Sequence, residues 1–314
     1  MLPRGMPFAH ERWPHLGAAL LLALLSSSLI REAREPAPLY ADEAEWMTAG
    51  YVAYTLLRDR APLERWDHAF DEHALGDWGN KNPPLGKYVI GWAIAAQVAN
   101  DRDVNDRHAF RPERAPTLIA ARTGIALCAS VALCASYWLS YELIGSALWA
   151  ALATLFLFFL PSFQFHAVRV YTDVPQIALL LCASAGMLRF ARNGQWRWLI
   201  FALVCGGLAC AVKFSAGAWS LGALGYCAWR SFERPRSLLP LMAALLIPLI
   251  SFVAVNPFLY RDPLGRSLAL AQSWQTSKAN QRLDPQFADT VVQSEGRRFV
   301  LVSARGALAP TSTP

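Results

Sequence analysis

Charged residues are scarce in this sequence. Asp, Glu, Lys and Arg make up 17% of its 314 residues, whereas they make up about a quarter of typical soluble proteins. Hydrophobic residues reach 54%, and the mean hydropathy is +0.25. This composition excludes an ordinary soluble domain and predicts an all-α, polytopic membrane protein. The formal charge of +6 does not indicate a nucleic-acid partner, because much of the arginine lies in short links between apolar runs.

Several motifs that would assign a function are absent. The sequence has no Walker loop, no dinucleotide-binding fingerprint and no nucleophile elbow. His73, His108 and His166 have no ligand spacing, so no zinc site is predicted. All six cysteines fall in apolar segments: Cys128, Cys134, Cys182, Cys205, Cys210 and Cys227. Cysteine in such segments mostly serves packing, so the sequence predicts neither disulfides nor a cysteine metal site.

Apolar runs predict a bundle of about seven transmembrane helices. Residues 16–31 are predicted to form an uncleaved first span after a cytoplasmic segment 1–15, because no small-x-small cleavage site follows the run. Residues 117–256 are predicted to form six further spans, with a tail at 257–314. The six spans are expected at about 117–139, 147–166, 175–191, 198–212, 214–229 and 238–255.

Positive charges then predict the orientation. The links 189–197 and 230–236 are rich in arginine and are expected in the cytoplasm. Counting spans back from these links makes the loop 32–116 external and the N-terminus cytoplasmic, provided that the apolar stretch 85–98 does not cross. That stretch is shorter than the roughly 20 residues needed to cross a bilayer, so an interfacial helix is predicted there.

An acidic pair opens an amphipathic helix in the external loop. Asp42 stands where an N-cap would, with Glu45 three residues later in a capping-box arrangement. Capping alone is one explanation of Asp42, but a cap does not need Glu43 beside it. Two adjacent carboxylates at a membrane surface suit a general base, a clamp for a divalent cation, or both.

The segment from Asn82 to Lys87 reads Asn-Pro-Pro-Leu-Gly-Lys. One interpretation is a rigid turn before the interfacial helix, with Lys87 extended toward lipid headgroups. The other is that the lysine binds the phosphate of a lipid-linked substrate. The residues alone do not separate the two.

The turn from Arg169 to Asp173 is also expected on the external face. Either Thr172 or Asp173 caps a helix started by Pro175, or Arg169 holds a phosphate and orients the acidic site. Lys213 lies in a tight hairpin between two spans and is expected mainly to reach headgroups. The resulting site candidates are Asp42 and Glu43 for catalysis, and Lys81, Asn82, Lys87, Arg169, Asp173 and Lys213 for substrate binding.

Together these stretches resemble the membrane glycosyltransferases of the GT-C fold, in particular the protein O-mannosyltransferase and aminoarabinose-transferase group. Asp42-Glu43 follows the first span, as the family's acidic pair does, and the segment ending at Lys87 resembles its Pro-Pro-Leu-Gly-Lys motif. Ala121-Arg122 opens the next span, and Arg169 to Asp173 resembles its Arg-x-x-x-Asp turn. The resemblance covers roughly residues 10–260.

The resemblance implies a polyprenyl-phosphate-linked sugar as donor and a lipid, glycan or protein as acceptor, with membrane lipids around the site. Asp42 would be the catalytic base and Glu43 would support it, while Lys87 and Arg169 would hold the lipid phosphate. No cofactor is certain, although a divalent cation at Asp42 and Glu43 remains an option.

Two features depart from the family pattern. Asn82, preceded by Lys81, stands where mannosyltransferases tend to have His and aminoarabinose transferases Lys, which leaves donor and acceptor identity open. Members usually have eleven or more spans, so the chain is expected to be C-terminally truncated relative to them. The alternative function is a non-catalytic membrane subunit, or a carrier or flippase component for a lipid-linked sugar.

Overall fold

The computed structural model describes residues 12–35, 38–39, 41–66, 83–98, 112, 114–233, 238–269 and 272. Throughout these ranges the regular structure is helical, without a strand. The prediction of an all-α membrane protein is confirmed. All six cysteines lie in helices, and each is a free thiol.

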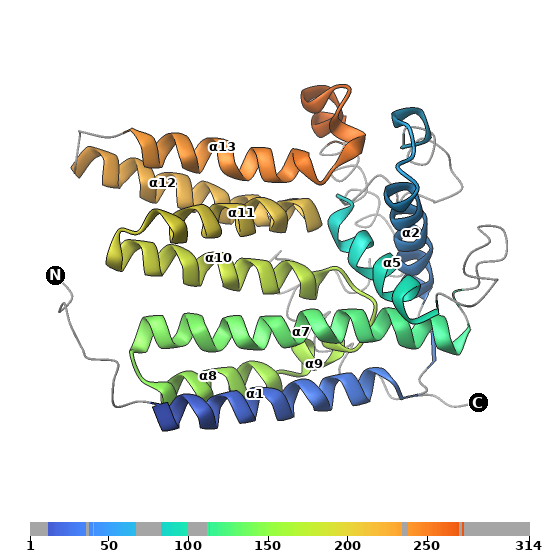
Figure 1. Cartoon of the computed structure of the whole chain (residues 1–314), viewed down its shortest axis with the longest axis horizontal. Coiled ribbons are helices and arrows are strands. Elements are labelled where there is room, and N and C mark those ends of the chain that lie inside the picture. Colours follow the sequence, from blue (N-terminus) through green and yellow to red (C-terminus); the bar gives the residue numbers. More distant parts are fainter. Residues whose placement is uncertain are drawn as a thin grey trace, which may run out of the picture.

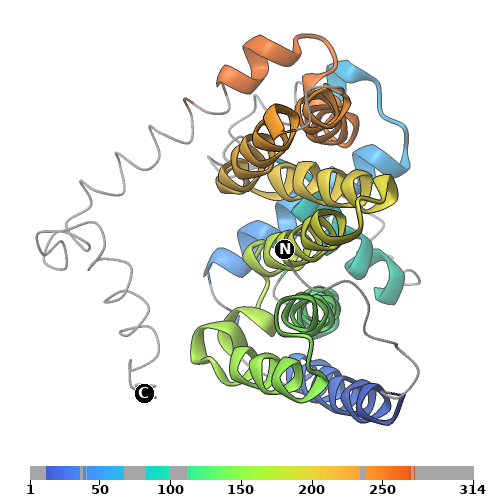
Figure 2. The ribbon, with the colours of Figure 1, turned by 90° about the vertical axis from the view of Figure 1, so that its left-hand side faces the viewer.

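Seven helices lie side by side and form the body of the molecule (Figures 1 and 2). They are α1 (Arg12–Ala33), α7 (Ala115–Ile144), α8 (Ala147–Phe159), α10 (Asp173–Asn193), α11 (Trp196–Val212), α12 (Gly217–Glu233) and α13 (Leu239–Ala254). The largest buried cluster joins α1, α7, α8 and α10, with alanines filling much of the buried face of α7. Such small side chains let helices approach closely in a membrane bundle.

The predicted count of seven spans is too high when length and hydropathy are both required. Three described helices meet both conditions: His15–Ala33, Ala115–Ile144 and Asp173–Asn193. The helices α11 and α13 are apolar, but they have 17 and 16 residues. At about 1.5 Å per residue such helices rise roughly 25 Å, less than the hydrocarbon thickness of about 30 Å.

The predicted span 147–166 is interrupted. The helix α8 ends at Phe159, and a short helix α9 (Pro161–Ala167) continues at an angle of 72° to it. Pro161 has no backbone N–H to donate within a helix, and it disfavours a helical conformation at Leu160. The bend therefore occurs at Leu160, whose backbone is extended. Counted as one broken span, this pair gives a fourth candidate crossing.

Two further helices, α2 (Ala41–Arg58) and α5 (Leu85–Val98), pack against each other across one end of the bundle (Figure 1). Their contact requires glycine. A Cβ added to Gly91 would lie 2.2 Å from the backbone oxygen of Gly50, so any side chain there would push the two helices apart. The helix expected over 85–98 is present as α5, and its 14 residues are too few to meet the length condition for a span.

Candidate active site

The described candidates gather at the end of the bundle that α2 and α5 cover (Figure 1). Glu43 lies in the first turn of α2 and meets the turn before α10 through the backbone N–H of Val170. Lys87 lies in the first turn of α5, and a Cβ on the adjacent Gly86 would lie 2.7 Å from the Thr172 side chain. Segments far apart in sequence are thus brought together at a single end of the molecule.

A buried ion pair holds the first turn of α2 in place. Arg122 of α7 donates from Nε to Oε1 of Glu43 at 2.9 Å and from Nη2 to Oε2 at 2.6 Å. The Arg122 side chain is 2% exposed and that of Glu43 is fully buried. Such two-pronged pairing fixes geometry as well as charge.

The same pair organises two neighbouring segments. The backbone N–H of Val170 donates to Oε1 of Glu43 at 3.0 Å, and Arg122 Nη2 donates to the carbonyl oxygen of Pro38 at 2.9 Å. Arg169 Nη1 reaches that carbonyl oxygen at 3.4 Å, and its guanidinium lies 5.9 Å from the Phe165 ring centre. The turn that carries Arg169 is therefore tied to the helix turn that carries Asp42 and Glu43.

These contacts constrain the role of Glu43. Both of its carboxylate oxygens accept hydrogen bonds from Arg122, so a divalent cation there would have to displace the guanidinium group. In the part of the chain that the structure describes, no cluster of three His, Cys, Asp or Glu side chains could hold a metal ion.

Lys87 is a buried lysine. Its side chain is 1% exposed, so the interpretation of this residue as a headgroup anchor is wrong: an anchor must reach the lipid surface. Burial lowers the pKa of Lys87 from 10.5 to about 7. Near neutral pH this lysine therefore holds its proton less tightly than an exposed lysine does.

Lys213 and Asp173 form an ion pair at the start of α10. Lys213 Nζ lies 2.6 Å from Asp173 Oδ1. The sequence had led us to expect that Lys213 reaches lipid headgroups, but its ammonium group points to this carboxylate. Gln176 Nε2 supports the hairpin by donating to the Lys213 carbonyl oxygen at 3.1 Å. The helix begins at Asp173, two residues before the predicted Pro175, and Thr172 at the N-cap makes no side-chain capping bond.

Two site candidates, Lys81 and Asn82, lie outside the described residues. So do His73 and His108, for which no zinc site was predicted. Asp42 belongs to α2 by its backbone, but its side chain is not described. Because α2 begins at Ala41, Asp42 stands inside the first turn instead of at the N-cap position.

Arg122 had no structural role predicted from the sequence, and Asn256 was not among the predicted site residues. The signal for Arg122 was present, because an ionisable residue within an otherwise apolar 30-residue helix needs a partner. Asn256 follows α13, is 1% exposed, and neither atom of its side-chain amide has a hydrogen-bond partner among the described residues.

Comparison with known protein families decides the classification. A family model described as dolichyl-phosphate-mannose-protein mannosyltransferase matches residues 77–263, more than half of the chain. The chain belongs to this family. The resemblance seen in the sequence is confirmed, and the protein is assigned to a family of integral membrane glycosyltransferases that use a lipid-phosphate-sugar donor. No curated protein and no solved structure matches the chain.

The matched range contains Lys87, Arg122, Arg169 and Lys213 but begins after the acidic pair. The mannosyltransferase family match therefore does not extend to Asp42 and Glu43. Their link to the matched region comes from the contacts of Glu43 with Arg122 and Val170.

Proposed function

We propose that this protein transfers a sugar from a polyprenyl-phosphate donor to an acceptor hydroxyl on a lipid, glycan or protein. The reaction takes place at the end of the bundle covered by α2 and α5. The observation that carries the proposal is the buried Glu43–Arg122 pair. It holds the first turn of α2, in which Asp42 lies, beside the segment that bears Arg169.

The proposed reaction is a displacement at the anomeric carbon of the sugar. The acceptor oxygen attacks this carbon, the bond from the carbon to the phosphate oxygen breaks, and the polyprenyl phosphate leaves with the electron pair. The Asp42 carboxylate takes the proton of the acceptor hydroxyl. Glu43 acts through position: its hydrogen bonds to Arg122 fix the turn in which Asp42 lies.

Two cations are proposed to bind the phosphate. Lys87 lies buried near the start of α5, and Arg169 lies half-buried in the turn before α10. Positive charge placed where the phosphate departs stabilises the leaving group more strongly in a site that excludes water. The Asp173–Lys213 pair supports this region by joining α10 to the end of α11.

The orientation is proposed from the opposite end of the bundle. Arg189 and Arg192 lie there and share the Glu142 carboxylate at 2.6 and 3.2 Å, and Arg197 and Arg230 lie in nearby helix ends. Excess Arg marks the cytoplasmic side. The end with α2 and α5 then faces outside, on the periplasmic side of a bacterial inner membrane.

A carrier or flippase is less well supported. Transporters place their charged binding groups near the bilayer midplane, in broken helices. The two buried-carboxylate ion pairs described here, Glu43–Arg122 and Glu142–Arg189, lie toward opposite ends of the 30-residue helix α7.

Donor preference tests the proposal. Sealed proteoliposomes containing the wild-type chain are given radiolabelled mannosyl-phosphate-polyprenol or GDP-mannose, with peptide, glycan and lipid acceptors. The proposal predicts label transfer from the lipid donor and none from GDP-mannose. Transfer from GDP-mannose alone, or movement of intact lipid donor across the bilayer without any transfer, contradicts it.

A further inference from the structure

An arginine cluster, formed by Arg189, Arg192 and Arg197, lies where α10 ends and α11 begins. This corner is at the end of the bundle opposite α2 and α5 (Figure 1). Arg189 and Arg192 lie near the end of α10, and Arg197 is the second residue of α11. Gly194, with a φ of 69°, turns the chain sharply between the two helices. The tight turn brings the three side chains to one corner of the molecule.

One buried carboxylate holds two of these arginines. Glu142 of α7 has a side chain that is 8% exposed, and it accepts hydrogen bonds from Arg189 Nη1 at 2.6 Å and Arg192 Nη1 at 3.2 Å. Trp138, one turn earlier on α7, donates from Nε1 to the same carboxylate at 3.3 Å. The two guanidinium groups are therefore held in fixed positions, unlike those of arginines that simply extend into water.

The indole ring of Trp198 contacts a second pair of arginines. The Cζ atom of Arg189 lies 4.8 Å from the Trp198 ring centre, and that of Arg197 lies 5.4 Å from it. Trp198 packs in turn against Trp138, with 5.4 Å between ring centres. Because stacking uses the face of a guanidinium group, the N–H groups along its edge stay available to an anion.

The arginine cluster and its contacts contain more donors than acceptors. Arg189 Nε and Trp198 Nε1 are buried and have no hydrogen-bond partner among the described residues. Three guanidinium groups meet one carboxylate in these contacts, and Arg197 Nε donates to the neutral side chain of Gln195 at 3.0 Å. Positive charge is therefore in excess. A ligand with a negative charge and several acceptor oxygens would supply the missing partners.

Apolar surface continues from the arginine cluster along α11. The Phe201 ring centre lies 5.8 Å from that of Trp138, and the Phe201 side chain is 37% exposed. The preceding residue, Ile200, is 46% exposed. On an integral membrane protein, exposed apolar side chains of this kind face acyl chains, and tryptophans lie at the level of the headgroups. An anion bound by the arginines would thus lie beside hydrocarbon.

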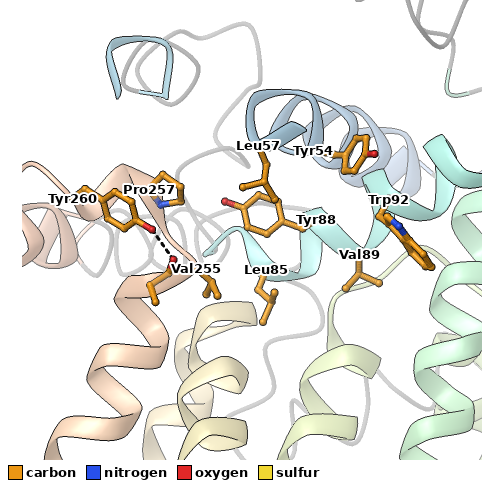
Figure 3. Close-up of a pocket in the computed structure, with 10 residues that line it drawn as sticks. Tyr54, Leu57, Leu85, Tyr88, Val89, Trp92, Val255, Pro257 and Tyr260 are labelled. Carbon is orange, nitrogen blue, oxygen red and sulfur yellow. Dashed lines mark hydrogen bonds between the residues drawn. The ribbon is translucent and has the colours of Figure 1, made fainter. Parts of the chain in front are cut away.

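The arginine cluster is chemically unlike the groove of about 490 Å³ that Figure 3 shows beside α5. Residues of α5, such as Val89 and Trp92, line that groove together with residues around Pro257, and none of the lining residues carries a charge. The groove thus offers apolar contacts at one end of the molecule, whereas the arginine cluster offers positive charge at the other.

We infer that the arginine cluster binds the phosphate group of an anionic phospholipid, whose acyl chains lie along Ile200 and Phe201. Arg192 and Arg197, which are exposed, contact the phosphate, and Glu142 and Trp198 hold the guanidinium groups in position. Basic pockets between membrane helices bind anionic headgroups in this way. The site is remote from the proposed transfer site, and binding there needs no sugar donor.

Native mass spectrometry of the purified full chain in detergent tests the site. The protein is titrated with phosphatidylglycerol and with phosphatidylcholine carrying the same acyl chains. The first phosphatidylglycerol should bind about ten-fold more tightly than phosphatidylcholine. Arg192→Gln and Arg197→Gln should each reduce this preference by about five-fold. Arg230→Gln, which removes the same charge from the last turn of α12, should change it by less than about two-fold.

Three results would overturn the inference. Equal binding of the two lipids by the wild type removes the anion preference. An equal reduction in all three variants indicates general attraction between a positive protein and a negative lipid. Displacement of phosphatidylglycerol by an equal concentration of glycerol phosphate, which has no acyl chains, indicates a site for a soluble anion.

A measurement on the wild type alone keeps the inference testable if a variant does not fold. A ligand that binds the folded state raises the melting temperature. Phosphatidylglycerol should therefore raise the melting temperature of the wild type more than phosphatidylcholine does, and high salt should reduce the difference. Equal melting temperatures in the two lipids would contradict the inference.

Discussion

Replacing Arg122 by methionine should destabilise the protein more than the loss of any exposed ion pair. The substitution leaves the Glu43 carboxylate fully buried without its guanidinium partner. Breaking a buried pair from one side costs about 3–5 kcal/mol. The Pro38 carbonyl oxygen also loses a donor at 2.9 Å. Chemical unfolding of the purified protein in detergent gives the free energy of unfolding for the comparison.

A double variant separates charge from position. Glu43→Leu combined with Arg122→Met removes both charges, so it should be more stable than Arg122→Met alone by at least about 1 kcal/mol. It should nevertheless transfer sugar poorly, because the Val170 N–H and the Pro38 carbonyl oxygen no longer meet partners that tie these segments together.

The matched control is Arg189→Met at the other end of the bundle. Arg189 is 35% exposed in its side chain, and Glu142 keeps Arg192 as a partner, so a loss of about 1 kcal/mol or less is expected. An Arg122→Met protein as stable as Arg189→Met would refute the reasoning. The reasoning would also be refuted if the double variant lost as much stability as Glu43→Leu and Arg122→Met lose in sum.

Three further predictions concern residues of α5. Because the pKa of Lys87 is lowered to about 7, the fraction of protein with a charged lysine falls as the pH rises through 7. The value of kcat/KM for the lipid donor should fall with that fraction. Lys87→Arg should flatten this dependence of kcat/KM on pH. In stability the sign is opposite: the unfolded chain binds the proton more tightly, so the free energy of unfolding should rise between about pH 7 and pH 10.5 in the wild type and not in Lys87→Met. Gly91→Ala places a Cβ 2.2 Å from the Gly50 oxygen and should cost about 1–3 kcal/mol of stability, whereas Gly222→Ala, in open space on α12, should be neutral or stabilising. A flat pH profile for the wild type, or equal stability of the two alanine variants, would contradict these predictions.

The bundle could largely be predicted from the sequence because apolar runs and helix periodicity are local signals. The helices α7, α10 and α11 begin and end within a few residues of the expected spans 117–139, 175–191 and 198–212. The bend at Pro161 was missed, since the run 147–166 is apolar on both sides of the proline. Hydropathy alone does not separate a straight span from a broken one.

The contacts among the candidate site residues could not be predicted from the sequence. Counting spans was enough to expect Glu43, Lys87 and Arg169 on one face. The partner of Glu43 lies 79 residues away in sequence, and no local pattern relates the two. Burial of Lys87 likewise depends on neighbours from other segments, so the sequence left its two interpretations even.

The central claim is that the acidic turn of α2 performs sugar transfer. The most direct measurement is the rate of label transfer from mannosyl-phosphate-polyprenol by purified wild type, Asp42→Asn and Asp59→Asn in proteoliposomes. Asp59 follows the same helix and pairs locally with Arg58 at 2.9 Å, which makes it a matched acid-to-amide control. The account predicts that Asp42→Asn lowers the rate at least 100-fold, as expected for loss of a general base, while Asp59→Asn retains the wild-type rate. Equal transfer by Asp42→Asn and wild type would contradict the account.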